Sequence, residues 1–317
     1  MAAKSKSNEI KITRIYDAPV KAVWDAWTDP DQVAKWWGPR GFTITTHSKD
    51  LRPGGHWAYT MHGPDGTNWE NKTIYHEVVE RSRLVYDHGG NDDRPPLFRV
   101  TATFQDVKGK TKLEMTMTLP TPEAAQETKK FIKAAGGNST WDRLAEYLEK
   151  ESTGHETFVI NRSFEAPINT VFEMWTNPEH FAKWIPPTGF TMKFLRADIK
   201  PGGSTLCMMT DGKGVEFYSR ADYLEIHRPD RIVYTQQFCD KDERPSRHPL
   251  APTWPESMKT TVLLTEEAPD ETRVTITWEA HGTWTKEELA TFVQGRAGMT
   301  QGWTGSFDKL EELLAKK

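Results

Sequence analysis

The chain carries one sequence pattern twice, and the second copy begins 148 positions after the first (14 to 162). Three pairs of segments show this: RIYDAP at 14–19 and RSFEAP at 162–167, VWDAWTDP at 23–30 and VFEMWTNP at 171–178, and DLRPGG at 50–55 and DIKPGG at 198–203. Solenoid repeats span only about 20–50 residues, so a repeat of this length indicates two globular domains of one fold. We expect these domains at residues 8–150 and 157–317, joined by a short polar linker at 149–156.

Composition narrows the function classes. Of the 317 residues, 36% are hydrophobic and 27% are charged, and the net charge of −4 gives no basic field that would attract nucleic acid. No apolar run has the length of a membrane span, and no segment resembles a secretory signal. The two cysteines both lie in the second half. These features predict a cytoplasmic protein in a reducing environment.

Each copy opens with a short β-like segment, at 10–16 or 157–164, that runs into Ala-Pro. Apolar residues then recur at i, i+3, i+4 and i+7 within 20–27 and 168–175, which predicts a helix with one buried stripe. Pro30 is expected to end the first of these helices, and a second short helix follows it.

From about Gly41 to Leu119 the apolar period changes to two, which is typical of antiparallel strands with one covered face. Pro64-Asp65-Gly66 and Asp211-Gly212-Lys213-Gly214 are typical of hairpin turns. We therefore expect one meandering sheet in each copy.

Each copy closes with helices. Thr121-Pro122-Glu123 predicts a helix start, and Thr285 with Glu288 forms a capping-box pattern. Glycines are expected to interrupt the pattern before the final helix, at Gly136, Gly137, Gly295, Gly298 and Gly302. The final helices carry apolar stripes: Trp141, Leu144 and Leu148, and in the second copy Trp303, Phe307, Leu310 and Leu314.

This order of elements resembles the helix-grip fold of the START-like (SRPBCC) superfamily. Within that superfamily, Lys-Trp-Trp-Gly-Pro at 35–39 and Arg-Pro-Gly-Gly at 52–55 resemble the domain named after the activator of heat-shock-protein-ninety ATPase. The second copy departs from the first motif, because Ile185-Pro186 stands in place of Trp37-Gly38. The resemblance implies an α+β fold with two tandem helix-grip domains, each a curved antiparallel sheet wrapped around a long C-terminal helix.

In relatives with this fold, the space between sheet and helix often holds an apolar molecule, so the resemblance implies a small apolar ligand. The candidate cavity residues are Trp57, Tyr59, Met61, Trp69, Phe98, Met115, Met117 and Trp141 in the first copy, and Cys207, Met209, Phe217, Met258, Ile276, Trp278 and Trp303 in the second. Methionine suits a pocket that accepts varied shapes. The alternative interpretation is that these side chains simply fill the core of a half-buried sheet.

The sequence predicts no catalytic residue, no metal site and no cofactor. None of the ten histidines has a histidine at the equivalent position of the other copy, and no Cys-x-x-Cys or Gly-x-Ser-x-Gly motif occurs. His56 and His62 fall on one face of a predicted strand. They are either solvated strand residues or members of a ligand or metal site in the first domain.

The copies differ in length at one connection. Eleven residues separate Tyr86 from Phe98, whereas 23 separate Tyr234 from Met258. The longer segment contains His248 and Trp254, and insertions with aromatic residues often line a cavity mouth or contact a partner. A tolerated surface excursion is the alternative.

Three function classes remain. The first is non-catalytic binding of a small apolar molecule in one or both cavities. The second is a co-chaperone-like protein that activates a heat-shock-protein ATPase, as the family name implies. The third is a cavity enzyme of the cyclase type, which also occurs in the superfamily. The sequence favours the first class over an enzyme, with a chaperone as the alternative partner and with neither nucleic acid nor membrane as a partner.

Overall fold

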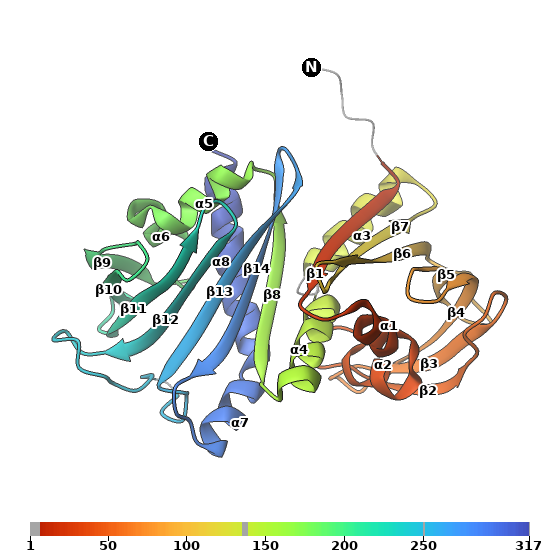
Figure 1. The fold of residues 1–317 in the computed structure, drawn as a ribbon, viewed down its shortest axis with the longest axis horizontal. Coiled ribbons are helices and arrows are strands. Elements are labelled where there is room, and N and C mark those ends of the chain that lie inside the picture. Colours follow the sequence, from red (N-terminus) through yellow and green to blue (C-terminus); the bar gives the residue numbers. More distant parts are fainter. Residues whose placement is uncertain (1–6, 135–138, 250, 317) are drawn as a thin grey trace. The chain divides into compact units, whose positions relative to one another are not determined.

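The structure is a computed structural model that describes residues 7–134, 139–249 and 251–316. The chain forms two compact units and passes from the first to the second between Gly154 and His155. Each unit is an α+β domain with one seven-stranded antiparallel sheet (Figure 1). This architecture confirms the predicted fold class.

In the first domain, strands β2 to β7 form the expected meander. The first strand, β1, pairs with β7 and forms one edge of the sheet. The sheet order is β1-β7-β6-β5-β4-β3-β2. The elements are β1 (Glu9–Tyr16), α1 (Val20–Thr28), α2 (Pro30–Trp36), β2 (Thr43–Lys49), β3 (His56–His62), β4 (Asn68–Val79), β5 (Arg83–Gly90), β6 (Phe98–Val107), β7 (Lys110–Thr118), α3 (Pro122–Ala134) and α4 (Ser139–Thr153).

The second domain repeats this topology, with the order β8-β14-β13-β12-β11-β10-β9. Its elements are β8 (Thr157–Phe164), α5 (Ile168–Thr176), α6 (Pro178–Trp184), β9 (Thr191–Ala197), β10 (Ser204–Thr210), β11 (Glu216–His227), β12 (Arg231–Cys239), β13 (Ser257–Ala268), β14 (Glu271–His281), α7 (Lys286–Gln294) and α8 (Arg296–Leu314). Both predicted hairpin turns connect adjacent strands, at β3–β4 and β10–β11.

The first two helices of each domain form where the apolar period of 3.6 predicts them. Val23, Trp24 and Trp27 of α1 are buried, as the predicted stripe requires. Pro30 begins α2 directly after α1 ends, and the Asp29 carboxylate accepts hydrogen bonds from two amides of the first turn of α2, at 2.9 and 3.0 Å. The Asp-Pro pair thus ends one helix and caps the next.

The final helix of each domain packs its apolar stripe inward. In the second domain α8 lies along one face of the sheet (Figure 1), and it buries the four stripe residues Trp303, Phe307, Leu310 and Leu314. The predicted capping box at Thr285 and Glu288 begins α7. None of the described helices is long and apolar enough to cross a bilayer.

Two predictions at the helix ends were wrong. The linker was expected from Glu149, but α4 continues to Thr153 and ends at Gly154, which has φ +77° and donates its amide to the Lys150 carbonyl at 2.9 Å. Glycine adopts this left-handed conformation without a steric cost, so the helix stops there rather than earlier. Gly298 and Gly302 also do not precede the final helix, because they lie inside α8. Gly136 and Gly137 lie outside the described residues.

Candidate functional site

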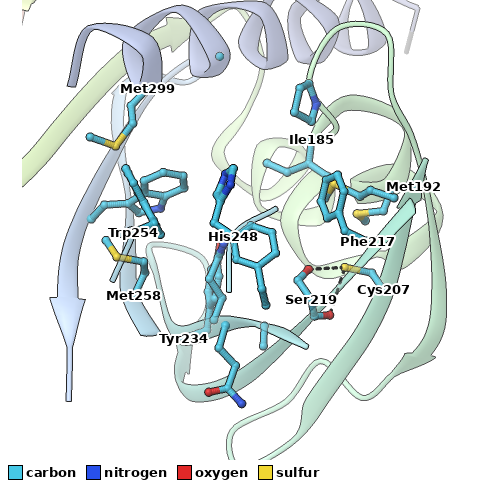
Figure 2. A pocket seen from close by; sticks show the side chains of 18 of the residues that line it. Ile185, Met192, Cys207, Phe217, Ser219, Tyr234, His248, Trp254, Met258 and Met299 are labelled. Atoms are coloured by element: carbon cyan, nitrogen blue, oxygen red, sulfur yellow. Dashed lines mark hydrogen bonds between the residues drawn. The ribbon is translucent and has the colours of Figure 1, made fainter. Parts of the chain in front are cut away.

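A cavity of about 430 Å³ lies in the second domain, between the inner face of the sheet and α8. Figure 2 shows side chains from strands β9 to β13, from α8 and from the connection between β12 and β13 pointing into one space. This volume falls within the range of roughly 300–1,000 Å³ that is typical of small-molecule sites.

The cavity walls are mainly aromatic and sulfur-bearing. Four methionines line it, on three strands and on α8: Met192, Met209, Met258 and Met299. The aromatic lining residues are Phe181, Phe194, Phe217, Tyr223, Tyr234, Phe238, Trp254, Trp278 and Trp303. Such walls bind apolar surface, and the flexible methionines allow ligands of different outline to fit.

The glycines of α8 leave one side of the cavity without side chains. Gly298 and Gly302 both line the cavity and are solvent-exposed, so the cavity opens to solvent beside this turn of the helix. A β-carbon added at either position would meet no neighbouring heavy atom within 4 Å. Glycine inside a helix costs roughly 1 kcal/mol relative to alanine. The two glycines therefore lower the stability of α8 while they leave this side of the cavity free of their side chains.

The first domain has aromatic side chains at four positions that are equivalent to lining residues of the cavity. Trp37, Trp57, Tyr59 and His88 form an aromatic cluster there, in which the Trp37 and Trp57 rings lie 5.3 Å apart and Trp57 stacks on Tyr59 at 4.1 Å. The Trp37 indole also donates to the Tyr59 hydroxyl at 3.2 Å.

At the same four places, 148 positions later, the second domain has smaller or non-aromatic residues. All four of these residues line the cavity: Ile185, Thr205, Cys207 and Gln236. The loss of aromatic bulk at these positions accounts for the space in the second domain.

The long connection between β12 and β13 forms another wall. His248 and Trp254 both line the cavity, and the His248 ring lies 4.8 Å from Phe238 and 6.1 Å from Trp254 (Figure 2). The connection is fixed to α7, because Arg247 pairs with Glu288 and the Thr253 hydroxyl bonds to that of Thr291 at 2.9 Å. Of the alternatives left open by the sequence, the structure shows that this insertion lines a cavity.

Several polar groups of the cavity are hydrogen-bonded within the protein, whereas the buried indole N–H groups of Trp278 and Trp303 have no partner among the described residues. The Cys207 thiol and the Ser219 hydroxyl lie 3.0 Å apart (Figure 2). The Ser306 hydroxyl donates to the Ile185 carbonyl at 2.9 Å. Burial raises the pKa of the Cys207 thiol, so this group stays protonated near neutral pH. Burial lowers the pKa of His248, which favours the neutral ring. The site therefore presents an uncharged interior.

Six of the seven candidate residues of the second domain line the cavity: Cys207, Met209, Phe217, Met258, Trp278 and Trp303. The seventh, Ile276, lies outside the lining and is fully buried in the core. Whether these residues contact a ligand stays a prediction.

The candidates of the first domain lie in or beside its core. Trp57, Tyr59, Met115 and Met117 are buried, and Met61, Phe98 and Trp141 pack against them. Trp69 differs, because 38% of its surface is exposed and its ring lies 5.4 Å from Phe42. Their role as ligand contacts also stays a prediction.

His56 and His62 lie on the exposed face of β3, where they bond to the hydroxyls of Ser48 and Thr45, both at 2.9 Å. Within residues 7–134, 139–249 and 251–316, no group of three or more His, Cys, Asp or Glu side chains is placed to hold a metal ion.

Several lining residues are not among the candidates predicted from the sequence, for example Gly298, Met299, Gly302 and Gln236. The signal for the glycines was their spacing, because 295, 298 and 302 share one face of a helix. They were interpreted as helix breaks because glycine has low helix propensity. Gln236 could have been found from its position two residues after Tyr234 on the same strand face.

Comparison with known proteins places both halves in one family. The family model described as "Activator of Hsp90 ATPase homolog 1-like protein" matches residues 17–149 and 165–315. No curated protein sequence matches the chain.

Among solved structures, a protein from Staphylococcus epidermidis is 28% identical, with a TM-score of 0.43, over 49% of this chain and 98% of its own. An AHSA1-like protein from Aeromonas hydrophila is 25% identical, with a TM-score of 0.35, over 45% of this chain and 94% of its own. DynU16, a protein of the dynemicin biosynthetic locus, is 19% identical, with a TM-score of 0.34, over 97% of this chain and 99% of its own. Because the family model matches most of both halves, the chain belongs to the family of Activator of Hsp90 ATPase homolog 1-like proteins.

Proposed function

We propose that the protein binds a small apolar molecule, without chemical conversion, in the cavity of its second domain. The observation that carries the proposal is the exchange of an aromatic cluster for Ile185, Thr205, Cys207 and Gln236, which leaves a space walled by aromatic and methionine side chains. Removal of apolar ligand surface from water stabilises such a complex by roughly 25 cal/mol per Å² before the cost of association. The chaperone role suggested by the family description rests on that description alone.

The interior offers binding contacts rather than a catalytic arrangement. The cavity thiol of Cys207 has its pKa raised by burial, whereas a nucleophilic cysteine needs a lowered pKa. The hydroxyls of Ser219 and Ser306 are engaged with a thiol and a backbone carbonyl. Neither serine is hydrogen-bonded to a histidine that could act as its general base.

The test restores first-domain bulk to the second-domain cavity. Thr205 is the counterpart of Trp57, and we expect Thr205→Trp to weaken binding of the uncharged fluorophore N-phenyl-1-naphthylamine to the full chain by about tenfold or more, since an indole ring would occupy the ligand space. Fluorescence titration measures the dissociation constant. The matched control is Ser204→Trp, because Ser204 is the neighbouring residue of β10 and lies outside the cavity lining.

A second variant keeps the test independent of core packing. Gly302→Phe adds bulk at an exposed helix position with open space around it, so it should block the cavity without disturbing the core. Each variant must first show a cooperative thermal transition. Unchanged fluorophore binding in both folded variants, or no binding by the wild-type chain, would overturn the proposed function.

A further inference from the structure

Gln236 brings an amide to the cavity wall that has no partner among the described residues. The indole N–H groups of Trp278 and Trp303, which also line the cavity, are likewise without a partner, but they can only donate, whereas an amide can both donate and accept. Tyr234, Gln236 and Phe238 alternate along β12, and all three line the cavity, so they share the inner face of the strand. Within the described chain, no other residue forms a hydrogen bond with the Gln236 side chain.

The neighbours of Gln236 explain why its amide is left without a partner. Its cross-strand partners are Ala221 on β11 and Met258 on β13, and both also line the cavity. Neither side chain can satisfy the donors and acceptor of an amide. A half-buried amide in such surroundings costs free energy unless a further molecule supplies hydrogen bonds.

The duplicated fold indicates that Gln236 is not required by the architecture. Tyr223 and Tyr234 occupy the same places as Tyr75 and Tyr86, so this tyrosine pair occurs in both domains. Gln236 instead replaces His88, whose ring is enclosed by aromatic neighbours: Trp37, Tyr86 and Phe98. The two domains therefore differ in the polar residue at this position, whereas they share the tyrosine pair.

The charge of the lining restricts what Gln236 can bind. No lysine or arginine lines the cavity, and the one carboxylate among the lining residues, Glu256, is exposed. An ionised ligand group would therefore lie in an apolar cavity without a counter-charge, which is unfavourable. A neutral amide can donate to a carbonyl or accept from a hydroxyl.

From these observations we propose that Gln236 is the specificity-determining residue of the cavity and binds an uncharged hydroxyl or carbonyl group on an otherwise apolar ligand. The inference rests on the proposed function and adds to it the chemical class of the ligand: a neutral molecule with an apolar body and a hydrogen-bonding oxygen. The aromatic walls bind the body, and the Gln236 amide sets its orientation.

The experiment compares two probes that have nearly the same shape, 2-naphthol and 2-methylnaphthalene, on the full chain at pH 7. The measured quantity is the ratio of their dissociation constants in the wild type, in Gln236→Leu and in Gln105→Leu. We expect Gln236→Leu to reduce the preference for 2-naphthol by about three- to tenfold, as the loss of one hydrogen bond predicts. Gln105→Leu makes the same change at an exposed strand residue outside the cavity lining, so it should leave the ratio unchanged.

The outcomes separate this inference from the proposed function. If the wild type binds both probes and Gln236→Leu leaves their ratio unchanged, the assignment of Gln236 is overturned while the binding function stands. An equal change in Gln105→Leu would overturn the assignment as well. If the wild type binds neither probe, the proposed function itself fails. Thermal melts of both variants establish that the comparison is made on folded protein.

Discussion

At the scale of single residues, Lys49 of the first domain is unusual because its ammonium group lies in a largely buried, aromatic environment. Its ammonium group lies 4.3 Å from the centre of the Trp57 ring and donates to the Trp27 carbonyl at 3.0 Å. Burial lowers the pKa of Lys49 to about 7, and the charge of Asp29 opposes this shift only partly. The second domain has Ala197 at the equivalent position, so the contact between Lys49 and Trp57 has no counterpart there.

We expect the Lys49 amine to titrate near neutral pH. Because the folded-state pKa lies below that of the unfolded chain, the unfolded state binds more protons between about pH 7 and pH 10. Stability should therefore rise with pH in this window, and the rise should be smaller in Lys49→Met. Lysine side-chain NMR titration measures the pKa, and urea unfolding at several pH values measures the stability. A pKa near 10 and parallel stability curves would contradict the expectation.

At the scale of elements, α8 combines a buried apolar stripe, which stabilises the helix, with glycines, which destabilise it. Its C-terminal turns bury Phe307, Leu310 and Leu314, whereas its first turns carry glycines beside the cavity. Packing of the buried stripe stabilises the helix enough to tolerate residues of low helix propensity. This explains why a segment with glycines at 298, 302 and 305 remains one continuous helix.

Gly298→Ala and Gly302→Ala should each raise the free energy of unfolding by roughly 0.5–1 kcal/mol, because alanine restricts the unfolded chain and neither β-carbon meets a neighbour. Gly305→Ala is the matched control on the same helix. Its β-carbon would lie 3.1 Å from the Thr188 hydroxyl oxygen, so a smaller gain or a loss is expected. Urea unfolding measures all three variants. Destabilisation by both Gly298→Ala and Gly302→Ala would show that these positions cannot accept a side chain.

At the scale of the whole molecule, the chain between the two domains is short. The α4 helix ends at Thr153, and Thr157 is already buried in β8. Glu156 also belongs to the second domain, since it pairs with Arg296 at 2.9 Å. The His155 ring also lies near the second domain, 3.8 Å from a carboxylate oxygen of Glu279. The connecting segment is thus reduced to Gly154, and we propose that the domains fold independently on either side of it.

Limited proteolysis should therefore cut the full chain first near the exposed Gly154, where the chain passes from one domain to the other. Mass spectrometry of the earliest fragments locates the cut. The two fragments should each retain a cooperative thermal transition after separation. A first cut inside either sheet, or unfolding of both fragments on separation, would show that the two domains depend on each other.

The sequence by itself determined the duplication, the element order and the fold. These follow from local signals: the repeat at 148 positions, the change of apolar period from 3.6 to two, and the Asp29-Pro30 and Thr285–Glu288 caps. The end of α4 was placed too early, because the helix continues to the left-handed Gly154. The glycines within 295–302 were interpreted as breaks, but packing of the buried stripe of α8 outweighed their low helix propensity.

Only the tertiary structure showed the cavity of the second domain. Thr205 and Cys207 lie on β10, Gln236 lies on β12 and Ile185 follows α6, and the sequence gives no sign that side chains from these three places meet in one space. A cavity depends on the summed volume of side chains that face one another across a sheet and a helix. That sum is set by register and by packing between elements, and no single segment of the chain contains it.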